Sequence, residues 1–450
     1  MKDLQWYHQL IAVISNLVWG TPTLILLFGT GLFFTARSGF IQFRKFKFAS
    51  KLLFKSTHKK SNHSSSVKGD ISPFQALMVA LAAAIGNGNI GGVATAIILG
   101  GPGAIFWMWL SAVFGMATMF AESVLGVQYR VQSKDGTISS GPMYYMRDGL
   151  GWSWLAGVFA FFMGCKALFS TTMVQSNSIT LVINHNTGVP MIITAAGLAI
   201  VTWIVIIGGL RRIGHIAEKL TPFMSLIYVA AGILSLVLFF DQIPHAFALI
   251  FKYAFHPSAA VGGFAGATMQ TAIRYGVARG SYSNEAGIGS APVAHGAAKT
   301  ASPAHQGLIA MLGVFVDTLV ICTMTALVIL VTGVWQSGTT STALAAEAYN
   351  SAFPQVGGWI VLLSSLLFGY SSLISWPYFG EQCFAYLFGS KIKTPYRWAF
   401  CTVIFIGGIT RVEFVWNIGD ILNGMMAIPN LITILALSGM VIKITKGKLS

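Results

Sequence analysis

The sequence predicts an all-α protein that crosses a membrane many times. Of its 450 residues, 55% are apolar and only 9% carry a formal charge, and the mean hydropathy is +0.70. About a quarter of the residues of a soluble globular protein are charged, so 28 basic and 13 acidic side chains are too few to cover its surface. The composition therefore excludes a cytosolic enzyme, a nucleic-acid-binding protein and a secreted disulfide scaffold, despite a net charge of +15.

Long uncharged stretches set the number of predicted spans, because about 20 apolar residues cross a bilayer as a helix. The first stretch, residues 11–35, is too long for a cleavable signal peptide. The uncharged residues between Asp70 and Glu122 accommodate two helices, with a turn at 100–103. The remaining spans are expected at 153–182, 189–208, 221–240, 260–278, 306–332, 357–387, 395–411 and 418–442. The prediction is eleven transmembrane helices.

The distribution of Lys and Arg predicts the orientation, because cytoplasmic loops are enriched in both. With the N-terminus outside, the predicted cytoplasmic segments contain 24 of these residues and the outer segments contain 3, while Lys166 lies within a span. The predicted cytoplasmic segments are 37–70, 130–147, 211–219, 274–299, 391–397 and 443–448. We expect a multi-pass protein of the cell (inner or plasma) membrane with its C-terminus in the cytoplasm.

Residues 86–92, Gly-Asn-Gly-Asn-Ile-Gly-Gly, interrupt the second span. They match GxGxxG, but a dinucleotide-binding fold needs a preceding strand and a following acidic residue that are missing here. Four glycines and two asparagines make a poor helix, and irregular backbone at membrane depth is tolerated where it is buried in protein or lines a cavity. A broken helix there presents N–H groups to an anionic substrate and carbonyls to a cation. Close helix packing through small residues is the alternative.

A second glycine-rich stretch, residues 262–270, lies in the seventh span. Its GxxxG pair leaves plain helix packing as an alternative. With the first span set aside, the two interrupted segments open two halves of five spans, which must have opposite topology because five is odd. The expected organisation is an extra N-terminal helix (1–36), a basic cytoplasmic loop (37–70) and five-helix repeats at 71–245 and 246–450. Matching interruptions in inverted halves indicate a transport site.

Polar residues in other spans are further candidates. Ser371 and Ser372 precede Trp376 in span 357–387, and hydroxyls beside a broken helix can bind a hard cation such as sodium, although they often bond to their own helix. Trp376 could close a pocket over a small side chain. Asp317 and Lys166 could pair with each other, line a water-filled path or take part in ion coupling. The polar segment 279–292 is either a gating loop or a simple connector.

Several stretches resemble the alanine or glycine:cation symporter family, also called sodium:alanine symporters. They are GNGNIGGVATAI (86–97), GGPGAIFWMW (100–109), SGPMYYM (140–146), GGFAGATMQTAIRYGVARG (262–280), SNEAGIGSAPVAHGAAKT (283–300), WPYFGEQ (376–382) and NGMMAIPNL (423–431). The resemblance implies eleven spans, of which the last ten form a LeuT-like 5+5 inverted repeat. The substrate-binding residues that it implies are Asn87, Gly88, Asn89, Met269, Gln270, Ile273, Ser372 and Trp376. Sodium is expected near Gly86, Asn89, Ser371 and Ser372.

The function expected from these observations is sodium-coupled import of a small neutral amino acid, such as alanine or glycine, by alternating access. The expected partners are that amino acid, a sodium ion and the lipid bilayer, with no nucleic acid and no cofactor other than sodium as the coupling ion. The oligomeric state stays open, with a monomer as the simplest case. The alternatives are proton coupling, a larger substrate such as glutamine, or a passive channel. An enzyme is disfavoured, because no nucleophile–base pair or metal-ligand spacing appears.

Overall fold

The computed structural model describes residue 14 and residues 18–58, 68–133, 136–256, 269–410 and 413–449, almost entirely as helices. The helices in the first part of the chain are α2 (Thr21–Arg37), α3 (Ile41–Arg44), α4 (Phe46–His58), α5 (Pro73–Ala84), η2 (Asn87–Asn89), α6 (Gly91–Gly100), α7 (Ala104–Gln128), α8 (Pro142–Leu150), α9 (Ser153–Cys165), η3 (Lys166–Thr171), α10 (Thr172–Thr187), α11 (Met191–Ile206), α12 (Gly209–Leu238), η4 (Phe240–Gln242) and α13 (Ile243–Phe255). Two short strands, β1 (Val131–Gln132) and β2 (Ile138–Ser139), pair antiparallel between α7 and α8.

The second part of the chain continues in the same way. Its helices are α14 (Met269–Asn284), α15 (Ala291–Gly296), α16 (Pro303–Val314), η5 (Phe315–Cys322), α17 (Thr323–Val331), η6 (Val334–Gln336), α18 (Ser341–Ala352), α19 (Gly357–Phe388), η7 (Ser390–Ile392), α20 (Lys393–Ile409), α21 (Glu413–Ala436) and α22 (Ser438–Leu449). The segments η3 and η5 are π-helical and continue the helices on both sides of them.

Five helices in the described part of the chain are long and apolar enough to span a membrane, and two bent helix pairs qualify if each pair is one span. The long helices are Ala104–Gln128, Ser153–Asn184, Gly209–Leu238, Pro303–Val331 and Gly357–Phe388. The bent pairs are Pro73–Ala84 with Asn87–Gly100, and Ile421–Ala436 with Ser438–Lys448. The predicted spans 153–182, 306–332 and 357–387 agree with these helices to within a few residues.

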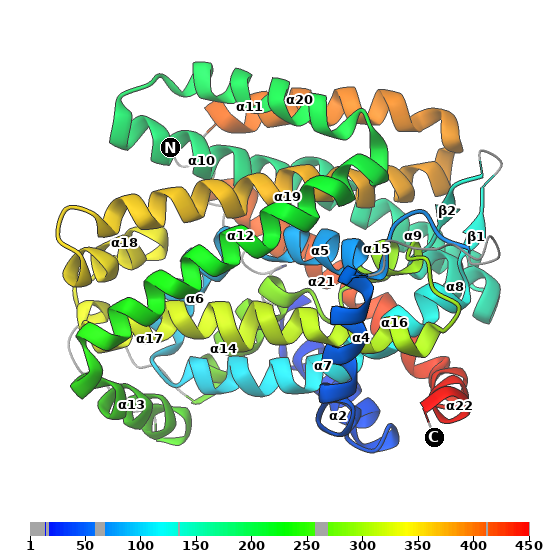
Figure 1. Ribbon diagram of the computed structural model, residues 1–450, viewed down its shortest axis with the longest axis horizontal. Helices are drawn as coiled ribbons and strands as arrows, with labels where there is room; N and C mark the ends of the chain where they lie inside the picture. The colour runs from blue at the N-terminus through cyan, green and yellow to red at the C-terminus, as the bar shows by residue number, and fades with distance from the viewer. Residues whose placement is uncertain are drawn as a thin grey trace.

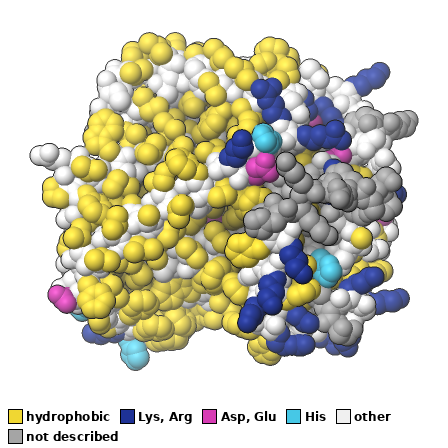
Figure 2. All heavy atoms as spheres, in the orientation of Figure 1, with side chains coloured by type: hydrophobic (Ala, Val, Ile, Leu, Met, Phe, Trp, Pro, Cys, Tyr) yellow, Lys and Arg dark blue, Asp and Glu magenta, His cyan; other side chains and the backbone are white. Residues whose placement is uncertain are grey.

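The long helices lie side by side, and the two ends of the bundle differ in charge. In Figure 1 the hairpin β1–β2, α8 and α22 lie at one end, whereas α13 and α18 lie at the other. Figure 2, in the same orientation, shows Lys and Arg gathered at the end with the hairpin and α22, and apolar side chains over much of the remaining face. Such a wide apolar surface is typical of a protein embedded in lipid.

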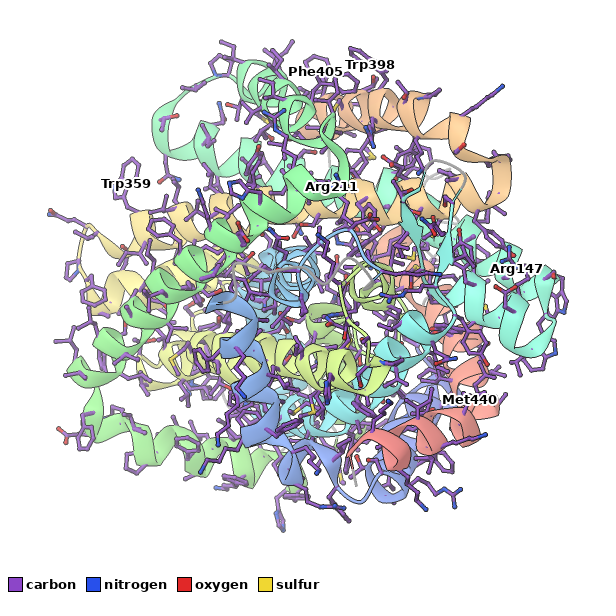
Figure 3. The ribbon with its side chains drawn as sticks, turned by 45° about the vertical axis from the view of Figure 1, so that its right-hand side comes forward. Arg147, Arg211, Trp359, Trp398, Phe405 and Met440 are labelled. Atoms are coloured by element: carbon purple, nitrogen blue, oxygen red, sulfur yellow. The ribbon has the colours of Figure 1, made fainter. Side chains whose placement is uncertain are left out.

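Aromatic side chains cover the periphery of the bundle. Figure 3 shows Trp359, Trp398 and Phe405 pointing outward from α19 and α20. Trp203 of α11 stacks on Trp398, with the ring centroids 3.8 Å apart. These two helices therefore pack through a contact at the outer surface.

Local sequence signals explain how the central elements start and pack. Ser72 and Gln75 form a capping box at the start of α5, and Pro73 occupies its first turn. In α14, a Cβ atom on Gly276 would lie 2.3 Å from the carbonyl oxygen of Ala104. Only glycine allows α14 and α7 to approach this closely.

Some predicted boundaries differ from the structure. The helix α12 begins at Gly209, well before the predicted start at 221, because the charged stretch 211–219 is helical. The segment 37–70, expected to be a loop, contains α3 and α4. The predicted span 418–442 is a pair of helices bent by 59°. Most residues of the predicted span 11–35 that precede α2 lie outside the described residues.

Candidate functional site

The second predicted span is broken, as its glycine and asparagine content predicted. The helix α5 ends at Ala84, the backbone is extended at Ile85 and Gly86, and η2 leads into α6. The axes on the two sides of the break differ by 62°. Asn87, Gly88 and Asn89 form η2 and are all buried. The backbone N–H and C=O groups that lose their helical partners at the break therefore lie in the buried interior of the bundle, where they face neighbouring helices rather than the surface.

Asn87 connects the break to two other helices. Its Nδ2 donates a hydrogen bond of 2.8 Å to Oε1 of Gln175 on α10, and its Oδ1 accepts one of 2.5 Å from the hydroxyl of Ser365 on α19. Asn177, two residues further along α10, donates instead to the carbonyl of Thr410. Gln175 and Ser365 thus contact the break although the predicted set of site residues did not include them.

Asn89 connects the break to a buried carboxylate. Its Nδ2 donates to Oδ1 of Asp317 at 2.7 Å, while its Oδ1 accepts a 2.9 Å bond from the amide of Gly86. The hydroxyls of Ser283 and Thr318 each donate to Oδ2 of Asp317 at 2.8 Å. Carboxylate and hydroxyl oxygens therefore meet within one buried cluster, which Asn89 contacts through its amide nitrogen; oxygen atoms of these kinds are the ligands that a hard cation prefers. No group of three or more His, Cys, Asp or Glu side chains suited to a metal occurs among the residues described.

The predicted residues of α19 contact the end of α5. The hydroxyl of Ser371 donates to the carbonyls of Ala82 and Ile85 at 3.1 and 3.3 Å, and that of Ser372 lies 3.4 Å from the carbonyl of Ala83. Both hydroxyls also reach the carbonyl of Phe368 in their own helix, at 2.8 and 3.2 Å. Each hydroxyl has one hydrogen to donate, and its shortest contact is with its own helix, so both hydroxyl oxygens lie beside the carbonyls released by the break without satisfying all of them. Nε1 of Trp376 donates to Ala83 at 3.2 Å.

A second irregular segment, residues 285–290, lies between α14 and α15. Glu285, Gly287 and Gly289 have positive φ angles of 58°, 88° and 89°. Residues 283–290 of the polar segment 279–292 are buried, and its two expected roles, a gating loop or a simple connector, stay predictions. Glu285 has left-handed backbone directly after α14 ends at Asn284, and glycine permits positive φ angles again at 287 and 289.

The second irregular segment lies next to the first, and the two helix pairs run in opposite directions. A Cβ on Gly88 would lie 3.2 Å from the ring of Tyr282, near the end of α14, and one on Gly100 would lie 3.1 Å from Tyr275, near its start. Ile71, which precedes α5, and Ala298, which follows α15, also lie side by side and form a parallel β-bridge. The segment 285–290 is therefore the structural counterpart of residues 85–90. The predicted break at 262–270 lies outside the described residues up to Thr268.

Two buried polar groups hold this second segment. The amide of Gly287 donates to Glu122 of α7 at 3.3 Å, and its carbonyl accepts a 2.9 Å bond from Asn430 of α21. Asn430 also donates to Glu122 and accepts from Tyr145. Glu122 thus fixes the backbone of the segment and has no access to the surface, since it is fully buried.

Lys166 pairs with the second segment rather than with Asp317. Its Nζ lies 3.4 Å from Oε1 of Glu285 and 3.9 Å from the centre of the Trp376 ring. The predicted alternative of a Lys166–Asp317 pair is therefore wrong. The hydroxyl of Ser290 donates to the other carboxylate oxygen of Glu285 at 2.5 Å. Lys166 links π-helical η3 to both the broken backbone and a predicted pocket residue.

Met269, Gln270 and Ile273 lie elsewhere in this structure. They line an open groove of about 500 Å³ together with Trp107 and residues of α2 such as Phe28. They lie near the start of α14, level with Gly100 rather than with η2. Their predicted role in substrate binding stays a prediction, whereas the other predicted residues, from Gly86 to Asn89 and from Ser371 to Trp376, are brought together.

Two oppositely directed broken segments at the centre of an apolar helical bundle define a secondary transporter of the LeuT-like fold class. The fold agrees with this. The crystal structure titled MhsT in complex with L-phenylalanine covers 83% of this chain and 90% of its own, with a TM-score of 0.60 and 14% sequence identity.

Sequence comparison identifies the family. The sodium:alanine symporter family matches residues 4–447, and the chain belongs to this family. It is 46% identical over 449 residues to the sodium/alanine symporter AgcS of Methanococcus maripaludis, covering 98% of this chain and 97% of that protein. It is also 37% identical to the probable sodium/glutamine symporter GlnT of Bacillus subtilis, over 97% of this chain and 90% of that protein. The protein is therefore a multi-pass membrane transporter of the amino-acid:cation symporter type.

Proposed function

We propose that the chain imports a small neutral amino acid, such as alanine or glycine, together with sodium by alternating access. The observation that carries this proposal is the broken helix at residues 85–90, around which buried oxygen atoms of three other helices gather. The substrate carboxylate would lie at the amino end of α6, where the helix dipole and unpaired N–H groups favour an anion. Asn87, Gly88 and Asn89 would form this part of the pocket, and Trp376 would form its wall.

Sodium has two candidate positions in this proposal. One uses the carbonyls of Ala82 and Ile85 with the hydroxyl oxygens of Ser371 and Ser372, whose contacts at 3.1–3.5 Å are longer than cation–oxygen distances and would shorten on binding. The other is the cluster at Asp317. The carboxylate there, beside an asparagine amide and two hydroxyls, supplies a negative charge as well as oxygen ligands. Electrostatic attraction of a cation is therefore stronger at the Asp317 cluster than at the uncharged serine hydroxyls and carbonyls.

The proposed topology has eleven spans, with α2 preceding two inverted five-span repeats at 71–245 and 246–450. The antiparallel arrangement of α5–α6 and α14–α15 supports the repeat. The basic end of the bundle would face the cytoplasm, in accordance with the positive-inside rule. Arg274 and Arg279 were counted among the Lys and Arg residues of the predicted cytoplasmic segments, but both lie within the helix α14.

Uptake into proteoliposomes tests this proposal. An inward sodium gradient should drive accumulation of radiolabelled alanine above its external concentration, and replacement of sodium by choline should abolish it. Asn89→Ala should lose most of this uptake, whereas Asn186→Ala, an exposed position of α10, should keep it. Equilibration without accumulation would indicate a passive channel, and uptake that follows pH without sodium would indicate proton coupling. If unlabelled glutamine inhibits the uptake of labelled alanine more strongly than unlabelled alanine does, glutamine would be the preferred substrate.

A further inference from the structure

A cavity of about 340 Å³ lies outside the transport site, where the N-terminal and C-terminal helices meet. It is formed by the end of α2, the turn into α3 and the last turns of α22. The residues that line it are Ala36, Arg37, Ser38, Gly39, Ile41, Arg44, Lys45, Ile442, Thr445 and Lys446. Four of these side chains are basic and none of them is acidic.

The chemistry of the cavity is that of a site for an anion with an apolar portion. The guanidinium of Arg44 is held over the turn by a 3.2 Å hydrogen bond to the carbonyl of Gly39. Basic side chains that line one cavity, with no acidic side chain among them, attract an anion inside it. Ala36, Ile41 and Ile442 give the same cavity an apolar wall.

The surroundings of the cavity are those of a membrane surface. Leu32 of α2 is 54% exposed, and Phe40 and Phe43 beside the turn are 55% and 62% exposed. Along α22 the exposed side chains change from apolar Met440, labelled in Figure 3, to Lys446 at the cavity. The cavity thus lies where apolar surface gives way to basic surface, as expected of a protein surface at the edge of the hydrocarbon core.

We propose that this cavity binds the phosphate headgroup of an anionic phospholipid, whose acyl chains lie along the exposed apolar side chains of α2. Basic pockets between transmembrane helices at a membrane surface are suited to such headgroups. Free phosphate lacks the acyl chains and would use only the basic half of the cavity. The bound lipid would bridge α2–α3 to α22 and so connect the two ends of the chain.

Native mass spectrometry of the full chain tests this site. The protein is titrated with phosphatidylglycerol and with phosphatidylcholine of the same acyl chains. We expect a tight phosphatidylglycerol site that phosphatidylcholine does not fill. The triple variant Arg37→Gln/Arg44→Gln/Lys446→Gln should weaken it by about fivefold for each charge removed, the factor for a basic residue near an anionic lipid surface.

The matched control removes the same charge at another place. Arg211→Gln/Arg212→Gln/Lys219→Gln changes exposed residues of α12 and should leave the site intact. Equal losses in the two triple variants, equal binding of the two lipids, or displacement of the lipid by millimolar inorganic phosphate would each overturn the proposal. If the first variant does not fold, Ala36→Trp fills the cavity without a charge change and should abolish the same binding.

Discussion

The buried pair of Lys166 and Glu285 allows a quantitative prediction. Their side chains are 4% and 7% exposed, the charged atoms are 3.4 Å apart, and the ammonium also lies over the ring of Trp376. Lys166→Met removes the cation without a large change of volume. Glu285→Gln removes the anion but keeps the oxygen that accepts from Ser290.

The expected magnitudes follow from this geometry. At 3.4 Å and an effective dielectric constant of about 20, the attraction between the charges is about 5 kcal/mol. Removal of one member of a buried pair typically costs roughly 3–5 kcal/mol, because the other charge stays buried without its counter-charge. In Glu285→Gln the ammonium keeps the face of Trp376, and a desolvated cation–π contact contributes on the order of 2 kcal/mol. In Lys166→Met the carboxylate has no such replacement.

We therefore expect Lys166→Met to lower the free energy of unfolding by about 3–5 kcal/mol, Glu285→Gln by less, and the double variant by less than either effect alone. The measurement is equilibrium unfolding in mixed micelles, read as a double-mutant cycle. Asp148→Asn is the matched control, since Asp148 forms an exposed pair with Arg147 and should change stability by less than about 1 kcal/mol. Additive effects in the cycle, or a larger effect for Glu285→Gln than for Lys166→Met, would refute the reasoning.

Three further predictions concern the site and the packing around it. Asp317→Asn should raise the sodium concentration for half-maximal uptake by about tenfold or more, because the carboxylate is the charged member of its cluster; an unchanged sodium dependence would remove Asp317 from ion coupling. Trp376→Ala should enlarge the pocket, so that larger neutral amino acids compete better against alanine in uptake; an unchanged competition profile would contradict its role as a wall. Gly276→Ala should lower the melting temperature, because its new Cβ would lie 2.3 Å from a carbonyl oxygen and overpacking costs about 1–3 kcal/mol or more. Gly197→Ala, where nothing lies within 4 Å, should keep or raise it.

The first break could be predicted from the sequence, whereas the irregular backbone at 285–290 was not predicted. Residues 86–92 combine poor helix formers with a position inside an otherwise apolar span, so that composition alone indicates an interruption. The stretches 262–270 and 285–290 are both rich in glycine, and the charged residues between them, Arg274 and Arg279, were taken as the end of the span. In the structure α14 continues through both arginines, whose guanidinium groups lie 5.8 and 5.9 Å from the ring centres of Tyr275 and Tyr282. Each arginine thus lies beside a tyrosine ring within the helix, where the rule for uncharged spans expects no charge.

The partners of the predicted residues could not be read from the sequence either. Asn87 and Asn89 were identified as poor helix formers inside a span and through the family resemblance, but nothing near them in the chain names Gln175, Ser365 or Asp317. These contacts bridge more than 80 residues of sequence in every case. Helical periodicity assigns a residue to a face of its own helix, and only tertiary packing assigns that face to a neighbour.

The two buried charges near the site share a local feature that the sequence does not signal. Lys166 begins the π-helical segment η3, and Asp317 lies within the π-helical segment η5; π-turns occur frequently at functional sites. From these positions both side chains contact the end of α14: Asp317 accepts a hydrogen bond from Ser283, and Lys166 pairs with Glu285. Asp317 also holds Asn89 in the first break. A displacement of residues 283–290 therefore changes the surroundings of the carboxylate that contacts the first break, which gives a direct physical route by which occupation of a cation site could bias the position of the second segment.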